Sequence, residues 1–505
     1  MKTSLQKVFF SQVFIFSLLP VCVGIGIDSQ ECICKVMALQ NQSCINNPIP
    51  SVLVANLPTC IEACGASWYY YDFWDIQKRI AAWVIPLIVI IGLAQFGPFR
   101  RRNKVAVLLH LLADPISSVG HLLWKLQNTR DYYTGFQANI PADIRRSATT
   151  ILSAYEEWEN VWYAERTDAI SPPTSRRKER VAEFIEWLQF DEKTRREACL
   201  RAADKLAAWR ASSLWTAFIG ILNYVVAISL AFIKVASGEF NNRTGHSIAF
   251  GMLHSWLIPA VFMTSLVGAY HTKSATRRVF VEMLKDTGTI AYQHQIHTSD
   301  LKLLRFPEHI QGDTFNYRLL EWCGGNPSFS SRQFSHGTKR AFLSIFAAVP
   351  FVLCTVGAVL ISYSTPTNGI GCRTVHQLSF LASWILSALL TWVFGHITRS
   401  SYSHWRLTLF KDTMVFIPQA VSFCGAFVGW YNSCYCWSAA ISLHDKAYVV
   451  LNPITQIRTV SMQQWAIIAG VVLALHFFFI ALVWGYYAPV VHLHKEQDID
   501  DDSQM

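Results

Sequence analysis

Cysteine is the residue whose number and spacing point most directly to chemistry in this chain. Eight of the 13 cysteines fall, in the topology derived below, on the outer side of a membrane, where the compartment is oxidising and thiols form disulfides. These eight are Cys32, Cys34, Cys44, Cys60, Cys64, Cys372, Cys434 and Cys436. The first five precede every predicted membrane span, and five thiols cannot all pair among themselves. At least one bridge must therefore reach a later loop or another chain.

Close spacing restricts the pairing further. Cys32 and Cys34 are separated by one residue, as are Cys434 and Cys436, which is too near for an easy mutual bridge. We therefore expect a disulfide between the N-terminal segment and Cys372, Cys434 or Cys436. Cys199 and Cys323 fall on the cytosolic side, where we expect free thiols.

Other residues that could do chemistry form no convincing set. His294 and His297 have metal-ligand spacing, but no nearby Cys or acid completes a site, so we interpret them as surface histidines. Four glutamates stand among helix-spaced aromatic residues and are interpreted as a solvated face: Glu156, Glu157, Glu159 and Glu165. The chain lacks a phosphate-binding glycine loop, a G-x-S-x-G elbow and an H-E-x-x-H motif. We predict no enzyme activity, no metal and no cofactor.

Polar residues within the predicted spans are His254, His476, Asn223 and Gln419. A haem held by two histidines is the sharper alternative, but ordinary hydrogen bonds between helices are favoured. None of the predicted spans contains Asp, Glu, Lys or Arg, and this absence counts against a proton-coupled carrier.

The elements that position these residues are membrane helices. The chain is 52% hydrophobic and only 15% charged, too apolar for soluble domains. A helix needs roughly 20 residues to cross a bilayer, and seven apolar stretches reach about that length. They are 80–99, 214–233, 248–270, 341–363, 378–396, 414–431 and 465–487. Their apolar runs are continuous, so the predicted fold is an all-α, seven-helix transmembrane bundle.

Residues 1–26 are predicted to be a signal peptide. Lys2 and Lys7 precede an apolar stretch, and Gly24 and Gly26 offer small residues for cleavage. An uncleaved signal anchor is the alternative.

Basic residues after the first span set the predicted orientation. With the N-terminus outside, the first span runs inward, and a topogenic cluster stops transfer on the cytosolic side. The cluster is Arg100, Arg101, Arg102 and Lys104. Its position explains it as a topogenic signal near anionic lipid, so we predict no nucleic-acid partner. Most of the chain's 43 Lys and Arg residues then lie in the cytosolic segments 100–213, 271–340, 397–413 and 488–505.

Two N-glycosylation sequons fall on the outer side in this topology, at Asn41 and Asn242. Residues 105–126 are apolar but include Asp114 and Pro115, so we interpret them as two short amphipathic pieces at the cytosolic interface, turned at this dipeptide. An eighth span at 105–126 is the alternative, and it would move Asn242 into the cytosol.

The soluble parts are a small cysteine-rich head at 27–79, an outer loop at 432–464 and a large cytosolic segment at 127–213. The 127–213 segment has helical periodicity, with one apolar face formed by Ile151, Tyr155, Trp158 and Trp162. A second helix follows a break at 171–173, and its apolar face is formed by Val181, Phe184, Ile185 and Leu188. We expect packed helices there, and a solvated acidic tail at 488–505.

The runs at 57–87, LLADPI at 111–116 and WCGGNPSF at 322–329 resemble a group of multi-pass membrane proteins from filamentous fungi. The resemblance covers most of the chain and implies no activity. A cysteine-rich head on seven helices is also similar to fungal seven-helix receptors, but five head cysteines and a first loop of more than 100 residues depart from that pattern.

We predict a non-enzymatic membrane protein of the plasma membrane or another secretory-pathway membrane, receptor-like in topology. Its partners would be the lipid bilayer and a cytosolic protein that binds the 127–213 segment. The alternative is a transporter or channel for an uncharged or weakly polar solute.

Overall fold

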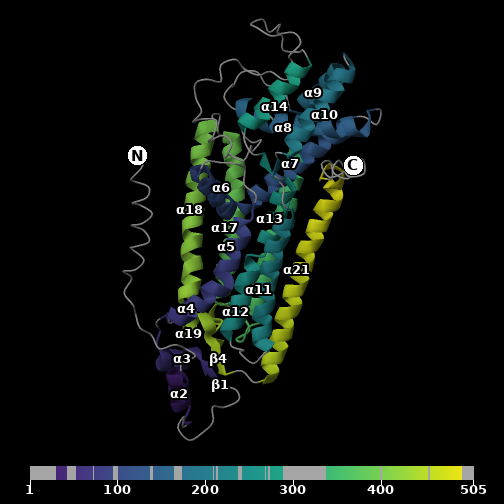
Figure 1. Cartoon of the computed structure of the whole chain (residues 1–505). Helices are drawn as coiled ribbons and strands as arrows, with labels where there is room; N and C mark the ends of the chain where they lie inside the picture. Colours follow the sequence, from purple (N-terminus) through teal and green to yellow (C-terminus); the bar gives the residue numbers. More distant parts are fainter. Residues whose placement is uncertain are drawn as a thin grey trace.

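Long helices run side by side through the middle of the molecule, with a different small unit at each end (Figure 1). The structure is a computed structural model. It describes residues 30–42, 53–66, 68–71, 73–94, 101–136, 140–163, 173–190, 192–208, 210–211, 214–236, 242–267, 269–270, 273–287, 337–397, 401–452 and 455–491. The predicted signal peptide, His294, His297 and Cys323 lie outside these residues.

Five helical stretches are long and apolar enough, by length and composition, to cross a membrane. They lie in α11 (Leu214–Ala236), α12 (Asn242–Leu253) with α13 (Leu257–Val267), α16 (Gly337–Tyr363), α17 (Cys372–Ile397) and α21 (Thr455–Val491). Each overlaps one predicted span, so five of the seven spans are confirmed as long apolar helices. The helical fold class is confirmed with them.

The outer surface of these helices is apolar, as a lipid-facing surface must be. Trp215 of α11 is 74% exposed, Ile345 of α16 is 70% exposed and Ile467 of α21 is 65% exposed. A soluble monomer rarely leaves so much contiguous apolar surface in water. The stretch formed by α12 and α13 is almost entirely buried and lies inside the bundle.

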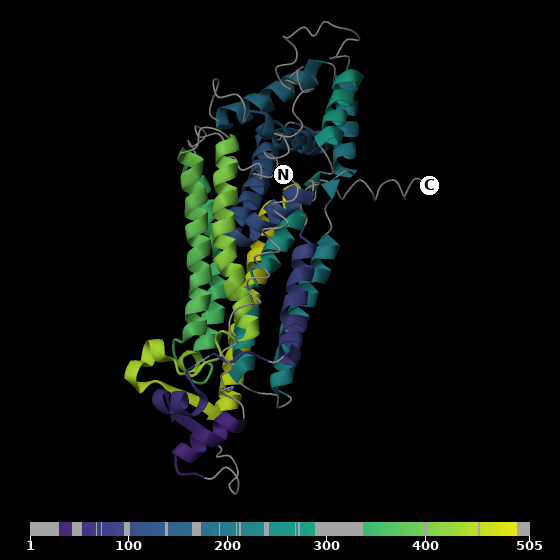
Figure 2. The ribbon, with the colours of Figure 1, turned by 90° about the vertical axis from the view of Figure 1, so that its left-hand side faces the viewer.

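The other two predicted spans are also helical but are not among the five. The first is a continuous helical rod made of α4 (Phe73–Arg79), η2 (Ile80–Val84) and α5 (Ile85–Gly92). The sixth lies in α18 (Ser401–Val428), which begins 13 residues before Met414, inside the segment expected to connect two spans. Helix α18 runs alongside the other long helices in both views (Figures 1 and 2).

The break at Asp114 is where the sequence predicts it. Helix α6 (Arg101–Ala113) and helix α7 (Pro115–Gly135) meet at an angle of 106°. The Asp114 side chain accepts a hydrogen bond from the Ser117 backbone N–H, and Pro115 occupies the first turn, the usual way to begin a helix.

The expected turn is therefore confirmed, and α7 also packs inside the bundle. Helix α7 packs against α16, α17, α13 and α21, and it buries Ile116, Val119, Leu123 and Leu126 in the core of the bundle. Taken together, α6 and α7 pass as a sixth candidate span that is broken or re-entrant.

The head lies at the lower end in Figure 1 and joins segments far apart in the sequence. Strand β1 (Leu53–Asn56) pairs antiparallel with β4 (Tyr448–Asn452). Helices α2 (Gln30–Leu39), α3 (Leu57–Cys64) and α19 (Cys434–Trp437) pack against this two-stranded sheet around a small core of their own. The head therefore contains both the N-terminal segment and the loop before α21.

Helices α8 (Ala142–Tyr163), α9 (Pro173–Phe190), α10 (Glu192–Ala208) and α14 (Lys273–Asp286) form a separate unit at the opposite end (Figure 1). Its core includes Ile151, Val181, Phe184 and Leu188, so the predicted packing of these residues is confirmed. Lys205 lies 2.7 Å from Glu282 and joins α10 to α14 across the surface.

Candidate functional site

A cluster of charged side chains lies buried where α6, α7, α17 and α18 meet. Its centre is the Lys411 ammonium of α18, which is 2% exposed. Lys411 Nζ donates to Asp114 Oδ2 at 2.6 Å and to Thr391 Oγ1 at 2.6 Å. It also lies 2.9 Å from Ser387 Oγ. The Lys411 ammonium therefore has hydrogen-bond acceptors on two side chains of α17 and on Asp114 at the helix break.

Asp114 has two roles in this cluster. One carboxylate oxygen caps α7, and the other accepts hydrogen bonds from Lys411 and the Thr391 hydroxyl. The carboxylate is completely buried. The residue that begins α7 therefore also ties it to α17 and α18.

Asp412 completes the cluster on the side of α6. Its Oδ1 lies 2.9 Å from Lys411 Nζ, and its Oδ2 accepts from His110 Nδ1 at 2.8 Å. Asp412 is fully buried, whereas the His110 side chain is 20% exposed. His110 is consequently the member through which the cluster meets its surroundings.

The charges do not cancel when His110 is neutral. Two carboxylates and one ammonium leave one negative charge, and a proton on His110 removes it. An uncompensated charge in a low-dielectric interior is costly, so among the described side chains a proton on His110 balances the cluster. The arrangement is therefore suited to taking up and releasing one positive charge.

A metal ion fits this place poorly. Donor atoms of His110, Asp114 and Asp412 lie within 4.8 Å of one another, as a metal site requires. Lys411 Nζ, however, already lies within 3 Å of both carboxylates and would repel a second cation. The sulfurs of Cys60, Cys64 and Cys434 also lie within 4.8 Å of one another, but they are used in disulfides.

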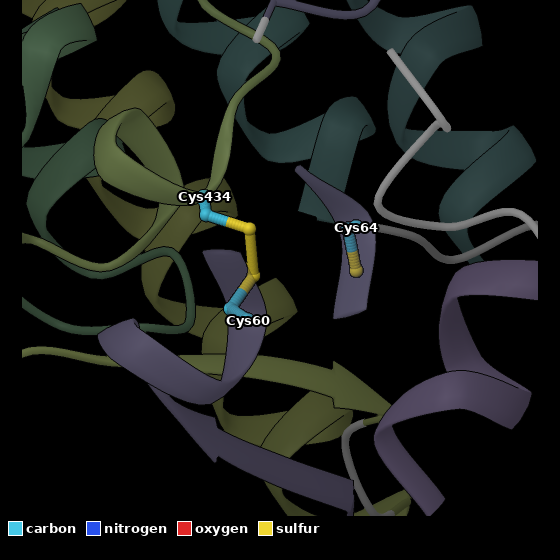
Figure 3. A group of neighbouring side chains, drawn as sticks. All are labelled: Cys60, Cys64 and Cys434. Atoms are coloured by element: carbon cyan, nitrogen blue, oxygen red, sulfur yellow. A yellow bond between two sulfur atoms is a disulfide. The ribbon is translucent and has the colours of Figure 1, made fainter. Parts of the chain in front are cut away.

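The structure brings six of the eight predicted outer cysteines together in three bridges: Cys32–Cys64, Cys60–Cys434 and Cys372–Cys436. Figure 3 shows the Cys60–Cys434 bridge, with Cys64 turned elsewhere. It joins the N-terminal segment to the loop before α21, the type of bridge expected from the odd count. Cys34 is disulfide-bonded as well, and Cys44 lies outside the described residues.

Both sequon asparagines belong to the end of the bundle that carries the head. Asn41 follows α2 and is exposed, and Asn242 begins α12. One turn later, the His246 ring packs on Trp437 of the head at 5.3 Å between centroids. Of the topogenic cluster, Arg101, Arg102 and Lys104 begin α6, whereas Arg100 lies outside the described residues. Helix α6 is in the half of the molecule away from the head (Figure 1).

The polar residues expected inside the bundle are mostly structural. His254 follows α12, and its Nδ1 donates to the Phe250 carbonyl of that helix. His476 Nδ1 lies 2.8 Å from the Val472 carbonyl oxygen in its own helix, and Nε2 lies 3.3 Å from the Pro350 carbonyl oxygen of α16. Gln419 donates to Ser383 on the neighbouring helix α17. Asn223 is exposed on α11, so its expected burial is wrong.

The expectation of an uncharged bundle is also wrong. Lys411 and Asp412 stand three and two residues before the predicted sixth span and were assigned to a connecting segment. A helix that begins at Ser401 carries them into the interior. The signal that could have revealed them is a Lys-Asp pair with apolar residues on both sides, LTLFKDTMVF at 407–416.

Comparison with protein-family models, with curated proteins and with solved structures finds no match to this chain. Its class therefore follows from the fold and the site alone. The protein is a multi-pass helical membrane protein with a buried cluster of charges.

Proposed function

We propose that the protein is a proton-coupled carrier for a small polar solute. One observation carries the proposal: Asp114, Lys411 and Asp412 form a buried ion cluster at a helix break, with one titratable histidine at its edge. Ionisable residues inside a membrane bundle are expensive and usually mark ion or proton pathways. Broken helices at the same place are typical of carriers.

Protonation of His110 is the proposed coupling event. The His110–Asp412 contact joins α6 to α18, and the Asp114–Lys411 contact joins the α7 terminus to the same helix. Adding or removing the proton changes the charge that holds these helices together, and so changes the relative stability of two bundle arrangements. We propose no catalytic chemistry.

We further propose seven crossings, with the signal peptide removed, the head outside and the α8–α10 unit in the cytosol. The opposite placement of the disulfide-bonded head and the basic start of α6 supports this orientation. Glycosidase-sensitive mass at Asn242 is the expected result. Absence of glycan at both sequons, together with labelling of the α8–α10 unit from outside intact cells, would contradict it.

The proposed transport is tested with purified protein in pyranine-loaded liposomes, in which the internal pH is measured. Inward gradients of glycerol, urea, lactate and methanesulfonate are applied in turn at fixed external pH. We expect at least one solute to change the internal pH faster than in protein-free liposomes, and His110→Gln to abolish the difference. Equal rates with and without protein for every solute would refute the proposal.

A receptor is the second candidate, favoured by the α8–α10 unit. This unit has its own core and lies at the end opposite the head, as expected of a platform for a cytosolic partner. Cross-linking of the full-length protein in its native membranes, with and without surface variants of Lys205 and Glu282, tests this. Loss of one specific cross-linked protein in the variants would favour the receptor.

A further inference from the structure

A pocket beneath the head is separate from the charge cluster. Residues of α4, η2, α12, α17 and α18 surround it, and Tyr71 and Tyr431 lie at its margin. Tyr71 is held there by hydrogen bonds between the backbone of 69–71 and that of 428–432. Gly429 permits this close approach, because a Cβ there would lie 2.5 Å from the Tyr69 carbonyl oxygen and its φ is +105°.

Two guanidinium groups give this pocket a positive character. Arg79 and Arg373 both line it, and the described residues of its lining include no Asp or Glu. The Arg79 guanidinium lies 3.8 Å from the Tyr71 ring centroid and 3.5 Å from the Ser247 hydroxyl, both neutral groups. A stacked guanidinium keeps its edge available for an anion.

Two buried side chains in the same lining have polar atoms without a partner. His376 is 7% exposed and Gln377 is 3% exposed. Among the described residues, nothing hydrogen-bonds to His376 Nε2 or Gln377 Oε1. Such atoms cost free energy when they are buried, so each one calls for an explanation.

The contacts of the other polar atoms in these two side chains indicate whether the unpartnered atoms are donors or acceptors. His376 Nδ1 lies 2.6 Å from Ser422 Oγ and 3.1 Å from Tyr431 Oη, and a hydroxyl can donate to it, which leaves the proton on Nε2. Gln377 Nε2 donates to Ser362 Oγ at 2.7 Å, and in this orientation of the amide Oε1 is left as an acceptor. The pocket thus offers one donor, one acceptor and the Arg79 cation.

We propose that this pocket binds a short hydroxycarboxylate. The carboxylate would bind Arg79 and the His376 Nε2–H, and the hydroxyl would donate to Gln377 Oε1. The cavity volume is about 50 Å³, several times the space that one water needs and consistent with a ligand of a few heavy atoms. Phe250 and Phe427 would contact its short apolar part.

Binding of the hydroxycarboxylate does not depend on the proposed carrier function. Only its transport after binding rests on that function. Helices α17 and α18 contribute to both sites, with His376 and Thr391 fifteen residues apart on α17, roughly 22 Å along a helix. The pocket therefore lies at the outer end of the helices that hold the charge cluster.

Binding of lactate, propionate and lactamide to the purified full-length protein, measured by calorimetry, tests the inference. Propionate lacks the hydroxyl and lactamide lacks the charge. We expect lactate to bind about tenfold more tightly than propionate, and lactamide to give no measurable heat. Equal affinities for lactate and lactamide, or no binding of lactate, would overturn the proposal.

Variants locate the site. Arg79→Gln should weaken lactate binding at least tenfold, and Gln377→Met should reduce it to the affinity of propionate. Arg130→Gln is the matched control, because Arg130 also stacks on a ring, that of Tyr486 at 3.4 Å, outside the pocket. An equal loss in Arg130→Gln would show that the effect is general. Lactate binding without a protein-dependent pH change for any of the four solutes refutes the carrier alone, and a glycerol-driven pH change without lactate binding refutes this inference alone.

Discussion

The buried charge cluster and the pocket beneath the head are both polar places in an apolar bundle, but they differ in how their groups are satisfied. Lys411 is surrounded by hydrogen-bonding oxygens, and Asp114 binds partners through both of its carboxylate oxygens. Asp412 Oδ1 makes no hydrogen bond among the described residues, but it lies 2.9 Å from the Lys411 ammonium, which compensates its charge. In the pocket, His376 and Gln377 each retain an unpartnered atom in the described structure. A satisfied group stabilises the fold, whereas an unsatisfied one is available to a ligand.

This difference has a direct consequence for mutation. Removing one member of a paired cluster exposes the others to an interior that does not solvate them. Removing a group that has no partner relieves a cost. The following four changes, in order of decreasing expected effect, test this contrast.

Lys411→Met should cause the largest loss of stability. It leaves the buried Asp114 and Asp412 carboxylates without their cation, which costs about 3–5 kcal/mol for a buried pair. Thermal unfolding in detergent, followed by size-exclusion fluorescence, measures it. The triple variant Lys411→Met/Asp114→Asn/Asp412→Asn is the control and should recover part of the loss. A single variant as stable as the parent would show that the cluster is not held by charge.

Asp114→Asn should cost less, about 1.5–3 kcal/mol, because asparagine still caps α7 while the charge-assisted bond to Lys411 is lost. Asp114→Ala removes the cap as well and should be less stable by about a further 1 kcal/mol. The same unfolding assay compares the two. If they are equally stable, the cap contributes nothing and the break at Asp114 has another cause.

Accessibility of introduced thiols should differ between the two places by about tenfold in labelling rate, equivalent to ~1.4 kcal/mol. Ala113 beside the cluster is fully buried, and Ala426 lines the pocket. A water-soluble methanethiosulfonate at pH 8 should label Ala426→Cys about tenfold faster than Ala113→Cys.

Cys199 serves as the internal control in that experiment. Burial in the α8–α10 core raises the pKa of its thiol to about 12, so at pH 8 it stays protonated and unreactive until the protein unfolds. Cys199 is a free thiol, as expected, but it is buried. Fast labelling of both Ala113→Cys and Cys199 would mean that the interior is open to water.

Gln377→Met should have the smallest effect on the ligand-free protein. It removes an unpartnered Oε1 together with one hydrogen bond to Ser362, so the free energy of unfolding should change by less than about 1 kcal/mol in either direction. Unfolding in lactate-free buffer measures it, with Gln419→Met as the control, because Gln419 bonds Ser383 across helices. A large destabilisation would show that the pocket amide is structural.

The sequence predicted what depends on long, uniform patterns. Five apolar stretches of about 20 residues became long helices, and the apolar faces at 151 and 181–188 became a core. The Asp114-Pro115 dipeptide predicted a turn because an aspartate cap and a proline begin a helix wherever they occur. Each of these signals is local, so no knowledge of distant contacts was needed.

The charge cluster was missed because its members are scattered. His110 and Asp114 stand about 300 residues before Lys411 and Asp412, and only the packing of α6 and α7 against α18 unites them. Taken alone, Lys411 and Asp412 look like a solvated boundary of a span. The pocket was missed for the same reason, since Arg79 and Arg373 come from helices that are distant in the chain.

The bridge between Cys60 and Cys434 has a consequence for synthesis. It links residues separated by 374 positions. At about 5–20 residues per second, the ribosome needs roughly 20–75 s to make the intervening chain. Throughout that interval Cys60 has no native partner, and strand β1 also lacks β4. Completion of the head is therefore a late step that requires the loop before α21 to lie on the same side of the membrane as the N-terminal segment. A chain truncated before Cys434 would reach the quality-control machinery with an unpaired thiol and an uncovered strand edge.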